Sequence, residues 1–185
     1  MRILLASESP RRKELLKAIF LSFDVYKTCI DENYEGLMPE DTVKEIAKRK
    51  LRVAVEKNTG YELVIAADTL VYCNGLYLGK PKDKADAIQI LTYLEGKTHE
   101  VYSGIAINFK GVEVIEHETS NVKFHSLTQE DIENYIATHD LLDKAGAYAI
   151  QDGVVVECFN GSFSNIMGLP ISKVNEILIK LGAKS

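Results

Sequence analysis

The sequence predicts a single α/β domain built on a mixed β-sheet. Segments typical of strands and of helices alternate along the chain, which favours an α/β architecture. Two pairs of strand-like segments are joined by short turns, Asn-Gly at 74–75 and Lys-Gly at 110–111, and such hairpins make antiparallel neighbours. With 185 residues and 46% hydrophobic composition, the chain is long enough for one well-packed domain, which we place at residues 1–185.

The first half of the chain opens with a strand and a capped helix. Residues 3–6 form a short apolar run typical of a buried strand. A helix over residues 10–19 follows, because Ser9 is a favourable N-cap and Pro10 suits the first helical position. The patterns downstream predict a strand at 23–28, a loop at 32–41, a helix at 42–57, a buried strand at 62–68 and a hairpin over 69–81.

The second half alternates in the same way. Asp83 is suited to cap a helix over 83–96, and Thr128 is suited to cap a helix over 128–139. This mixture of hairpins and crossover helices indicates a mixed sheet, because a purely parallel sheet would need a crossover between every pair of strands. The other expected elements are strands at 99–109, 112–125, 147–151 and 154–159 and a closing helix at 171–182.

Charge and cysteine content exclude several classes of protein. The net charge is −5 and the pI is near 5.5, whereas proteins that bind nucleic acid or anionic membranes present a basic face. Cys29, Cys73 and Cys158 form no C-x-x-C pair, which argues against a disulfide framework or a zinc site. No apolar segment approaches the roughly 20 residues of a membrane span. We therefore expect a soluble cytoplasmic protein without a nucleic-acid or membrane partner.

Two arginines stand where a helix disfavours cations. Arg11 and Arg12 fall in the first turn after Pro10, where the helix dipole makes each exposed cation cost about 0.3–1 kcal/mol. An anion docked at this turn would remove the conflict, because the free amides and both guanidiniums would attract it. The pattern therefore predicts a phosphate site, with two solvated arginines beside a surface carboxylate as the alternative.

Two acidic residues are candidates for a metal ligand or a general base. Asp68 ends the apolar run at 64–67, so we expect its carboxylate at a strand terminus. Glu32 follows a strand and opens a loop, from which it would share a divalent cation with Asp68. The alternatives are a turn or cap aspartate and a solvated glutamate.

Three further residues have side chains suited to a nucleotide. Lys80 lies between a glycine and a proline in a short loop, which suits a phosphate contact but also a solvated turn. Lys50 lies on a helix among other basic residues and contributes only if that helix borders a cleft. Gln151, in a segment that also holds Asp143 and Lys144, suits a base edge because an amide both donates and accepts.

Seven motifs read together resemble one known family. They are LLASESPRRKELL at 4–16, IDE at 30–32, AADTLV at 66–71, LGKP at 78–81, GKTHEVYSG at 96–104, DKAGAYAIQ at 143–151 and NIMGLP at 165–170. In this order they resemble the Maf family of nucleoside triphosphate pyrophosphatases. The resemblance implies a house-cleaning enzyme that hydrolyses a nucleoside triphosphate to the monophosphate and pyrophosphate with a divalent metal, Mg²⁺ or Mn²⁺. It also implies a twisted mixed β-sheet flanked by helices, with two lobes around a deep cleft, related to inosine triphosphate pyrophosphatases, and it suggests a homodimer.

The resemblance assigns roles to individual residues. Glu32 and Asp68 match the acidic positions that hold the metal, and Asp68 matches the proton acceptor. The positions that contact the substrate are matched by Ser9, Arg11, Arg12, Lys50 and Lys80.

Three positions bear on substrate choice. Arg11, Thr69 and Gln151 follow the branch of the family that prefers dTTP and UTP, whereas the 7-methyl-GTP branch differs at all three. Ala149 and Asp152 depart from the commoner A-G-A-Y-G-I-Q-G pattern, which bears on specificity more than on catalysis. The alternatives are a pyrophosphatase for 7-methyl-GTP or a deaminated purine triphosphate, and a non-catalytic nucleotide-binding regulator of cell division.

Overall fold

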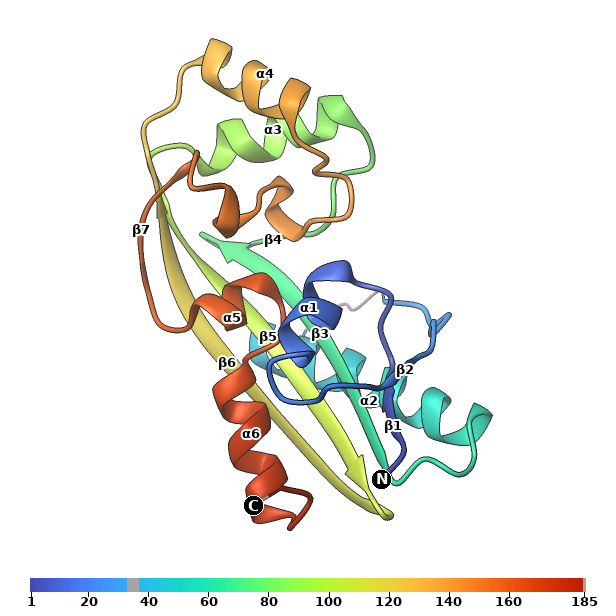
Figure 1. Cartoon of the computed structure of the whole chain (residues 1–185). Helices are drawn as coiled ribbons and strands as arrows, with labels where there is room; N and C mark the ends of the chain where they lie inside the picture. The colour runs from blue at the N-terminus through green and yellow to red at the C-terminus, as the bar shows by residue number, and fades with distance from the viewer. Residues whose placement is uncertain (33–36, 185) are drawn as a thin grey trace.

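A mixed β-sheet forms the centre of the computed structural model, which describes residues 1–32 and 37–184 (Figure 1). In these residues the sheet has seven strands in the order β2-β1-β3-β5-β6-β7, and β4 pairs separately with β3. Strands β1, β2 and β3 pair in parallel, and the other pairs are antiparallel. Two of the antiparallel pairs, β3–β4 and β5–β6, are the hairpins predicted at 74–75 and 110–111. The strands are β1 (Ile3–Leu5), β2 (Asp24–Val25), β3 (Leu63–Cys73), β4 (Leu76–Leu78), β5 (Thr98–Phe109), β6 (Val112–Phe124) and β7 (Val156–Asn160).

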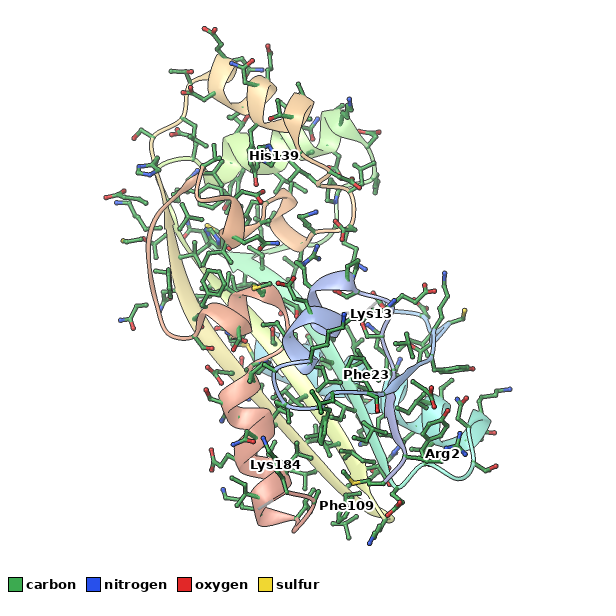
Figure 2. The ribbon with its side chains drawn as sticks, in the orientation of Figure 1. Arg2, Lys13, Phe23, Phe109, His139 and Lys184 are labelled. Atoms are coloured by element: carbon green, nitrogen blue, oxygen red, sulfur yellow. The ribbon has the colours of Figure 1, made fainter. Side chains whose placement is uncertain are left out.

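Helices cover both faces of the sheet and one of its ends. In Figure 1, α1, α5 and α6 lie in front of the sheet, α2 lies behind it, and α3 and α4 stack together beyond the end of β4. Figure 2 places His139 at this α3–α4 end, and Arg2 and Phe109 at the opposite end. The helices are α1 (Pro10–Leu16), α2 (Pro39–Lys57), α3 (Lys84–Leu94), α4 (Gln129–Thr138), α5 (Phe163–Met167) and α6 (Ile171–Lys180), with the 3₁₀ turns η1 (Ala145–Ala147) and η2 (Ile150–Asp152).

Alternation along β3 divides its side chains between two layers of the core. Ile65 and Ala67 pack with Leu178 of α6, whereas Val64 and Ala66 pack with Leu51 of α2. A third cluster fills the α3–α4 end. Because successive side chains of a strand point to opposite faces, Asp68 continues the layer beneath α2 and Thr69 continues the layer beneath α1 and α5.

Gly104 on β5 allows α2 to approach the sheet closely. It pairs directly with Asp68 across the two strands. A Cβ atom at this position would lie 2.1 Å from the carbonyl oxygen of Val43 in α2. The absence of a side chain therefore brings the helix that carries Lys50 down onto the strand that carries Asp68.

One edge of β3 is open in its middle. Strand β1 pairs with residues 63–65 and β4 pairs with residues 71–73, so residues 66–70 have a strand partner only on the β5 side. Side chains from both faces of β3 can meet at this opening, because no strand separates them there. The opening positions the candidate site.

Most predicted elements are confirmed, and several boundaries move. Helix α2 begins at Pro39 and not at residue 42, with Pro39 at the first position and two acidic residues in the first turn. Part of the loop predicted at 32–41, residues 33–36, lies outside the described residues. The segment predicted as a strand at 23–28 pairs only over Asp24–Val25. In the described ranges no helix is long and apolar enough to cross a membrane.

Two predictions are wrong. Asp68 does not end a strand, because β3 continues without interruption to Cys73 and Asp68 lies in its middle. Residues 147–151 do not form a strand but run from the end of η1 through a short connection into η2. The reason lies in the backbone, since Gly146 and Ala147 have φ angles of 73° and 57°, which a strand cannot accommodate.

Candidate active site

A polar pocket of about 400 Å³ lies at the open edge of β3. Its walls come from the segment after β1, the first turn of α1, the loop before Glu32, the middle of β3, the turn after β4, η1 and α5. Cations and apolar side chains both line the pocket. The cations are Arg11, Arg12, Lys27, Lys50, Lys80 and Lys144, and the apolar residues, here called the apolar wall, include Val71, Val101, Tyr148, Ile166 and Met167.

Lys50 joins the two predicted acidic residues. Its Nζ lies 2.7 Å from Oδ1 of Asp68 and 2.6 Å from Oε1 of Glu32. The side chains of Lys50 and Asp68 are only 8% and 10% exposed, while that of Glu32 is 47% exposed. Lys50 is thus not part of a solvated helix face, and helix α2 does border the pocket. The two carboxylates converge on one small cation.

The charge of Glu32 depends on its neighbours. Burial alone would raise the pKa of Glu32, but the hydrogen bond and the positive charge of Lys50, followed by the charges of Lys80 and Arg12, hold that pKa below its usual value. Lys80 is exposed at the pocket wall in the turn after β4. Glu32 is therefore an ionised carboxylate inside a cationic pocket.

The Arg12 guanidinium is fixed by three neutral groups. Its Nε donates to the carbonyl of Gly168 at 2.8 Å, and its two Nη atoms donate to Thr69 Oγ1 at 3.0 Å and to Ser7 Oγ at 3.2 Å. Burial lowers the pKa of Arg12, and the charge of Asp68 opposes this. Because these hydrogen-bond partners carry no charge, Arg12 brings a fixed positive charge to the pocket.

Gly168 makes the Arg12 contact possible. It ends α5 with a φ angle of 110°, a left-handed conformation that favours glycine. A Cβ atom there would lie 3.2 Å from Thr69 Oγ1 and 3.5 Å from Arg12 Nε. The segment 165–170, one of the seven motifs, thus ends a short helix and holds an arginine of the site.

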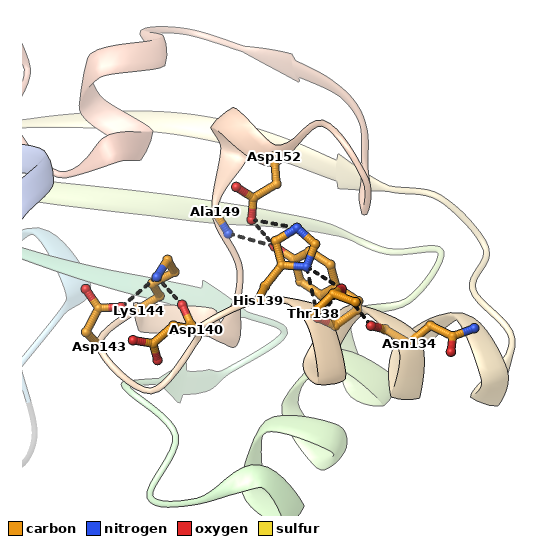
Figure 3. A network of polar contacts seen from close by, with 9 residues as sticks. Asn134, Thr138, His139, Asp140, Asp143, Lys144, Ala149 and Asp152 are labelled. Atoms are coloured by element: carbon orange, nitrogen blue, oxygen red, sulfur yellow. Dashed lines mark hydrogen bonds and ion pairs between the residues drawn. The ribbon is translucent and has the colours of Figure 1, made fainter.

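Arg11 makes a different contact, with a carboxylate. Its Nη1 lies 2.7 Å from Oδ2 of Asp143, and its Nη2 donates to the Asp143 carbonyl at 3.2 Å. The other carboxylate oxygen of Asp143 lies 2.7 Å from Lys144 Nζ, which also donates to the carbonyl of Asp140 (Figure 3). Burial alone would raise the pKa of Asp143, but the hydrogen bond from Lys144 and the charge of Arg11 hold it below its usual value.

The remaining predicted residues differ in their placement. Ser9 lines the pocket and caps α1, with its hydroxyl accepting from the backbone N–H of Arg12 at 3.5 Å. Thr69 lines the pocket and also lies 2.9 Å from Ser103 Oγ. Gln151 is exposed in η2 and is not part of the pocket wall. Asp68 is not part of the pocket wall either, but its carboxylate contacts Lys50, which is. The structure brings the other predicted residues together around the pocket and leaves Gln151 outside.

The carboxylate pair fits a divalent cation. In the part of the chain that the structure describes, no group of three or more His, Cys, Asp and Glu side chains forms a ready-made metal site. Mg²⁺ commonly takes only one or two protein carboxylates, and substrate phosphates and water supply its other ligands. Asp68 and Glu32 provide two such carboxylates. They converge on the point where the Lys50 ammonium lies between them.

Sequence reasoning missed several residues of the pocket. Ser7, Glu8 and Lys27 line it although no pattern singled them out, and Tyr148 fell in a segment predicted to be a strand. The one available signal for Ser7 was its place directly after a buried strand and before a helix cap, where loops present polar groups. Lys27 carries no such signal, since it lies in an irregular segment.

Two solved structures share the fold. The chain matches a HAM1 protein from Coxiella burnetii with a TM-score of 0.58 at 15% identity, covering 97% of this chain and 99% of that chain. It matches the Staphylococcus aureus Ham1 protein with a TM-score of 0.56 at 17% identity, covering all of both chains. These likenesses define the fold class and confirm the mixed sheet flanked by helices; the two lobes and the deep cleft stay predictions.

Sequence relatives define the family. The family model described as "Maf-like protein" matches residues 2–181. A dTTP/UTP pyrophosphatase from Caldicellulosiruptor bescii is 42% identical over 98% of this chain and 95% of the relative, and one from Clostridioides difficile is 44% identical over 97% and 95%. The chain belongs to the Maf family, which confirms the resemblance seen in its motifs.

Proposed function

We propose that residues 1–185 form one nucleoside triphosphate pyrophosphatase domain that cleaves the α–β phosphoanhydride bond of dTTP and UTP. The single observation that carries the proposal is the Lys50-bridged pair of carboxylates, Asp68 and Glu32, beside a pocket rich in cations. Carboxylates repel phosphate unless a metal intervenes, so a pocket built only to hold a nucleotide would gain nothing from them. The pair favours hydrolysis over simple binding.

The reaction follows from these charges. A water molecule attacks the α-phosphorus, the bond from that phosphorus to the α–β bridging oxygen breaks, and pyrophosphate leaves with the electron pair. Asp68 accepts the proton of the water, which forms the nucleoside monophosphate. Asp68 and Glu32 would hold Mg²⁺ or Mn²⁺, which supplies charge neutralisation and lowers the pKa of bound water.

The cations stabilise the phosphates. Arg12 brings a fixed charge, because its orientation is set by Gly168 and Thr69. Lys80 is exposed at the pocket wall, where its ammonium can reach a phosphate. Cations placed in this way stabilise charge that develops on the leaving group. The remaining members of the proposed substrate site are Ser9, Arg11 and Lys50.

The proposed substrate class rests on relatives and on one wall of the pocket. The curated relatives are named dTTP/UTP pyrophosphatases, and Arg11 and Thr69 lie in the pocket at two of the three positions that follow that branch. The apolar wall with Tyr148 and Met167 is suited to a base. Gln151 contributes to base choice only if η2 turns toward the pocket. The proposal includes a cytoplasmic location, which the free cysteines favour.

The exchange of Asp68 for asparagine tests the mechanism. Asp68→Asn keeps the shape of the side chain but removes the proton acceptor, so turnover of dTTP should fall at least 100-fold, while a nucleotide analogue still binds. Asp41→Asn, an exposed change on α2, is the matched control and should keep full turnover. Wild-type turnover in Asp68→Asn would remove Asp68 from the mechanism.

A further inference from the structure

Asp143 lies between two cations of the pocket. One of its carboxylate oxygens lies 2.7 Å from Arg11 Nη1 and the other lies 2.7 Å from Lys144 Nζ. Arg11 comes from α1, whereas Asp143 and Lys144 come from the segment between α4 and η1. All three line the pocket. The carboxylate thus links two walls of the pocket. A phosphate group in the same position would make the same contacts with Arg11 and Lys144.

The other pocket carboxylates have identifiable roles, and Asp143 does not. Glu32 belongs to the proposed metal pair, and Glu8 lies 3.0 Å from Lys27, both of them largely exposed. Asp143 is ionised, since its neighbours hold its pKa below the usual value. It is 44% exposed and lines the pocket, so it adds negative charge to a pocket meant for anions.

Such a carboxylate weakens anion binding in two ways. It occupies N–H donors of Arg11 and Lys144 that would otherwise reach a phosphate, and it repels the phosphate directly. A ligand must displace it or bind without those donors. Either route lowers affinity for every phosphate-bearing ligand, including the product that has to leave.

We propose that Asp143 is an internal counter-ion of the active site, which competes with phosphate groups for Arg11 and Lys144 and thereby keeps the affinity for pyrophosphate low enough for its release. The inference rests on the proposed function. It assigns to Asp143 a role opposite to that of a positioning residue. A positioning residue would strengthen binding by holding Arg11 in place, whereas a counter-ion weakens it.

The test measures the affinity of pyrophosphate and of α,β-imido-UTP by calorimetry at a fixed Mg²⁺ concentration. Asp143→Asn keeps the shape and an oxygen for Arg11 but removes the charge, so both ligands should bind about 3- to 10-fold more tightly. The KM for the substrate should fall in parallel. In a Lys144→Met background, the gain of affinity from Asp143→Asn should be smaller, because Arg11 is then the one remaining cation of the pair that the substitution frees for phosphate.

Asp140→Asn is the matched control. It removes the same charge from an exposed side chain on the same segment, where only the backbone carbonyl contacts Lys144. It should leave both affinities at the wild-type value. Weaker binding in Asp143→Asn would overturn the inference and make Asp143 a positioning residue. An equal gain of affinity in Asp140→Asn would also overturn it, because the effect would then come from long-range charge and not from the contacts of Asp143. A wild-type protein that binds neither ligand would instead overturn the proposed function itself.

Discussion

The Lys50 ammonium lies 2.7 Å from the Asp68 carboxylate, although one residue comes from helix α2 and the other from the middle of strand β3. Both side chains are nearly buried. Their contact depends on the close approach of α2 to the sheet at Gly104, which is the strand partner of Asp68. The helix, the strand and the glycine between them therefore form one structural unit with the proposed metal pair.

Replacing Lys50 by methionine should damage both stability and activity. Lys50→Met leaves Asp68 with a buried, unpaired charge that faces Glu32, and breaking a buried pair in this way costs about 3–5 kcal/mol. Urea unfolding should show this loss, and turnover should fall steeply. Lys48→Met on the same helix is the control, because Lys48 lies nearer the surface, where it forms an ion pair with Glu45 at 3.7 Å. Equal stability of the two variants would show that the Lys50 pair contributes nothing.

Replacing Thr69 by valine should weaken substrate binding more than turnover. Thr69→Val keeps the shape but removes the hydroxyl that accepts from Arg12 and lies 2.9 Å from Ser103. An unmade hydrogen bond of this kind costs about 1 kcal/mol, so KM for the substrate should rise about fivefold. Thr119→Val on β6, whose hydroxyl takes no part in the Arg12 contacts, should leave KM unchanged. An unaltered KM in Thr69→Val would mean that Arg12 keeps its place without Thr69.

Replacing Gly104 by alanine should displace α2. The added Cβ would lie 2.1 Å from a backbone carbonyl of the helix, and overpacking of this kind costs about 1–3 kcal/mol. The melting temperature should fall, and turnover should fall with it because Lys50 moves away from Asp68. Gly79→Ala is the control for stability, since its Cβ would meet open space. A Gly104→Ala protein as stable as the wild type would contradict the close packing of α2.

His99 should make the protein less stable in acid. Burial lowers the pKa of His99 to about 4 from 6.5, so between these values the unfolded chain binds a proton that the folded protein does not. Stability therefore falls as the pH falls from about 6.5 to 4, by about 3 kcal/mol in total. Urea unfolding of His99→Phe, which keeps an aromatic ring beside Phe124, should lose this part of the pH dependence.

The control for His99 is an exposed histidine. His125→Gln removes an imidazole from the surface and should retain the wild-type slope of stability against pH. If His99→Phe kept that slope as well, the acid sensitivity would come from other groups.

Local patterns were sufficient to predict most elements of the fold. The Asn-Gly turn at 74–75 and the caps Ser9, Asp83 and Thr128 were all placed correctly, because each depends on the chemistry of a few neighbouring residues. The length of β3 was not predictable in this way. The residues of β3 are almost all buried, so the polar Asp68 was the local feature that suggested the end of the strand. That indication was misleading, because the strand continues to Cys73.

The site was predictable in its residue types but not in its contacts. The arginines, lysines and acids were recognised, yet nothing local shows that Lys50 would be buried between Asp68 and Glu32, since that contact needs α2 to fold onto β3. The position of Gln151 also depends on distant structure. The left-handed residues Gly146 and Ala147 keep the chain from entering a strand before it reaches Gln151, and no alternation of apolar residues reports such a turn.

The proposed function is the hydrolysis of pyrimidine nucleoside triphosphates with a divalent metal. Pyrophosphate release should be measured from dTTP, UTP, 7-methyl-GTP and ITP with Mg²⁺ or Mn²⁺, with EDTA as the control. Release should require the metal and should be fastest with dTTP and UTP. No release from any of the four, with nucleotide binding still detectable, would contradict the proposed function and would make the cationic pocket a nucleotide sensor.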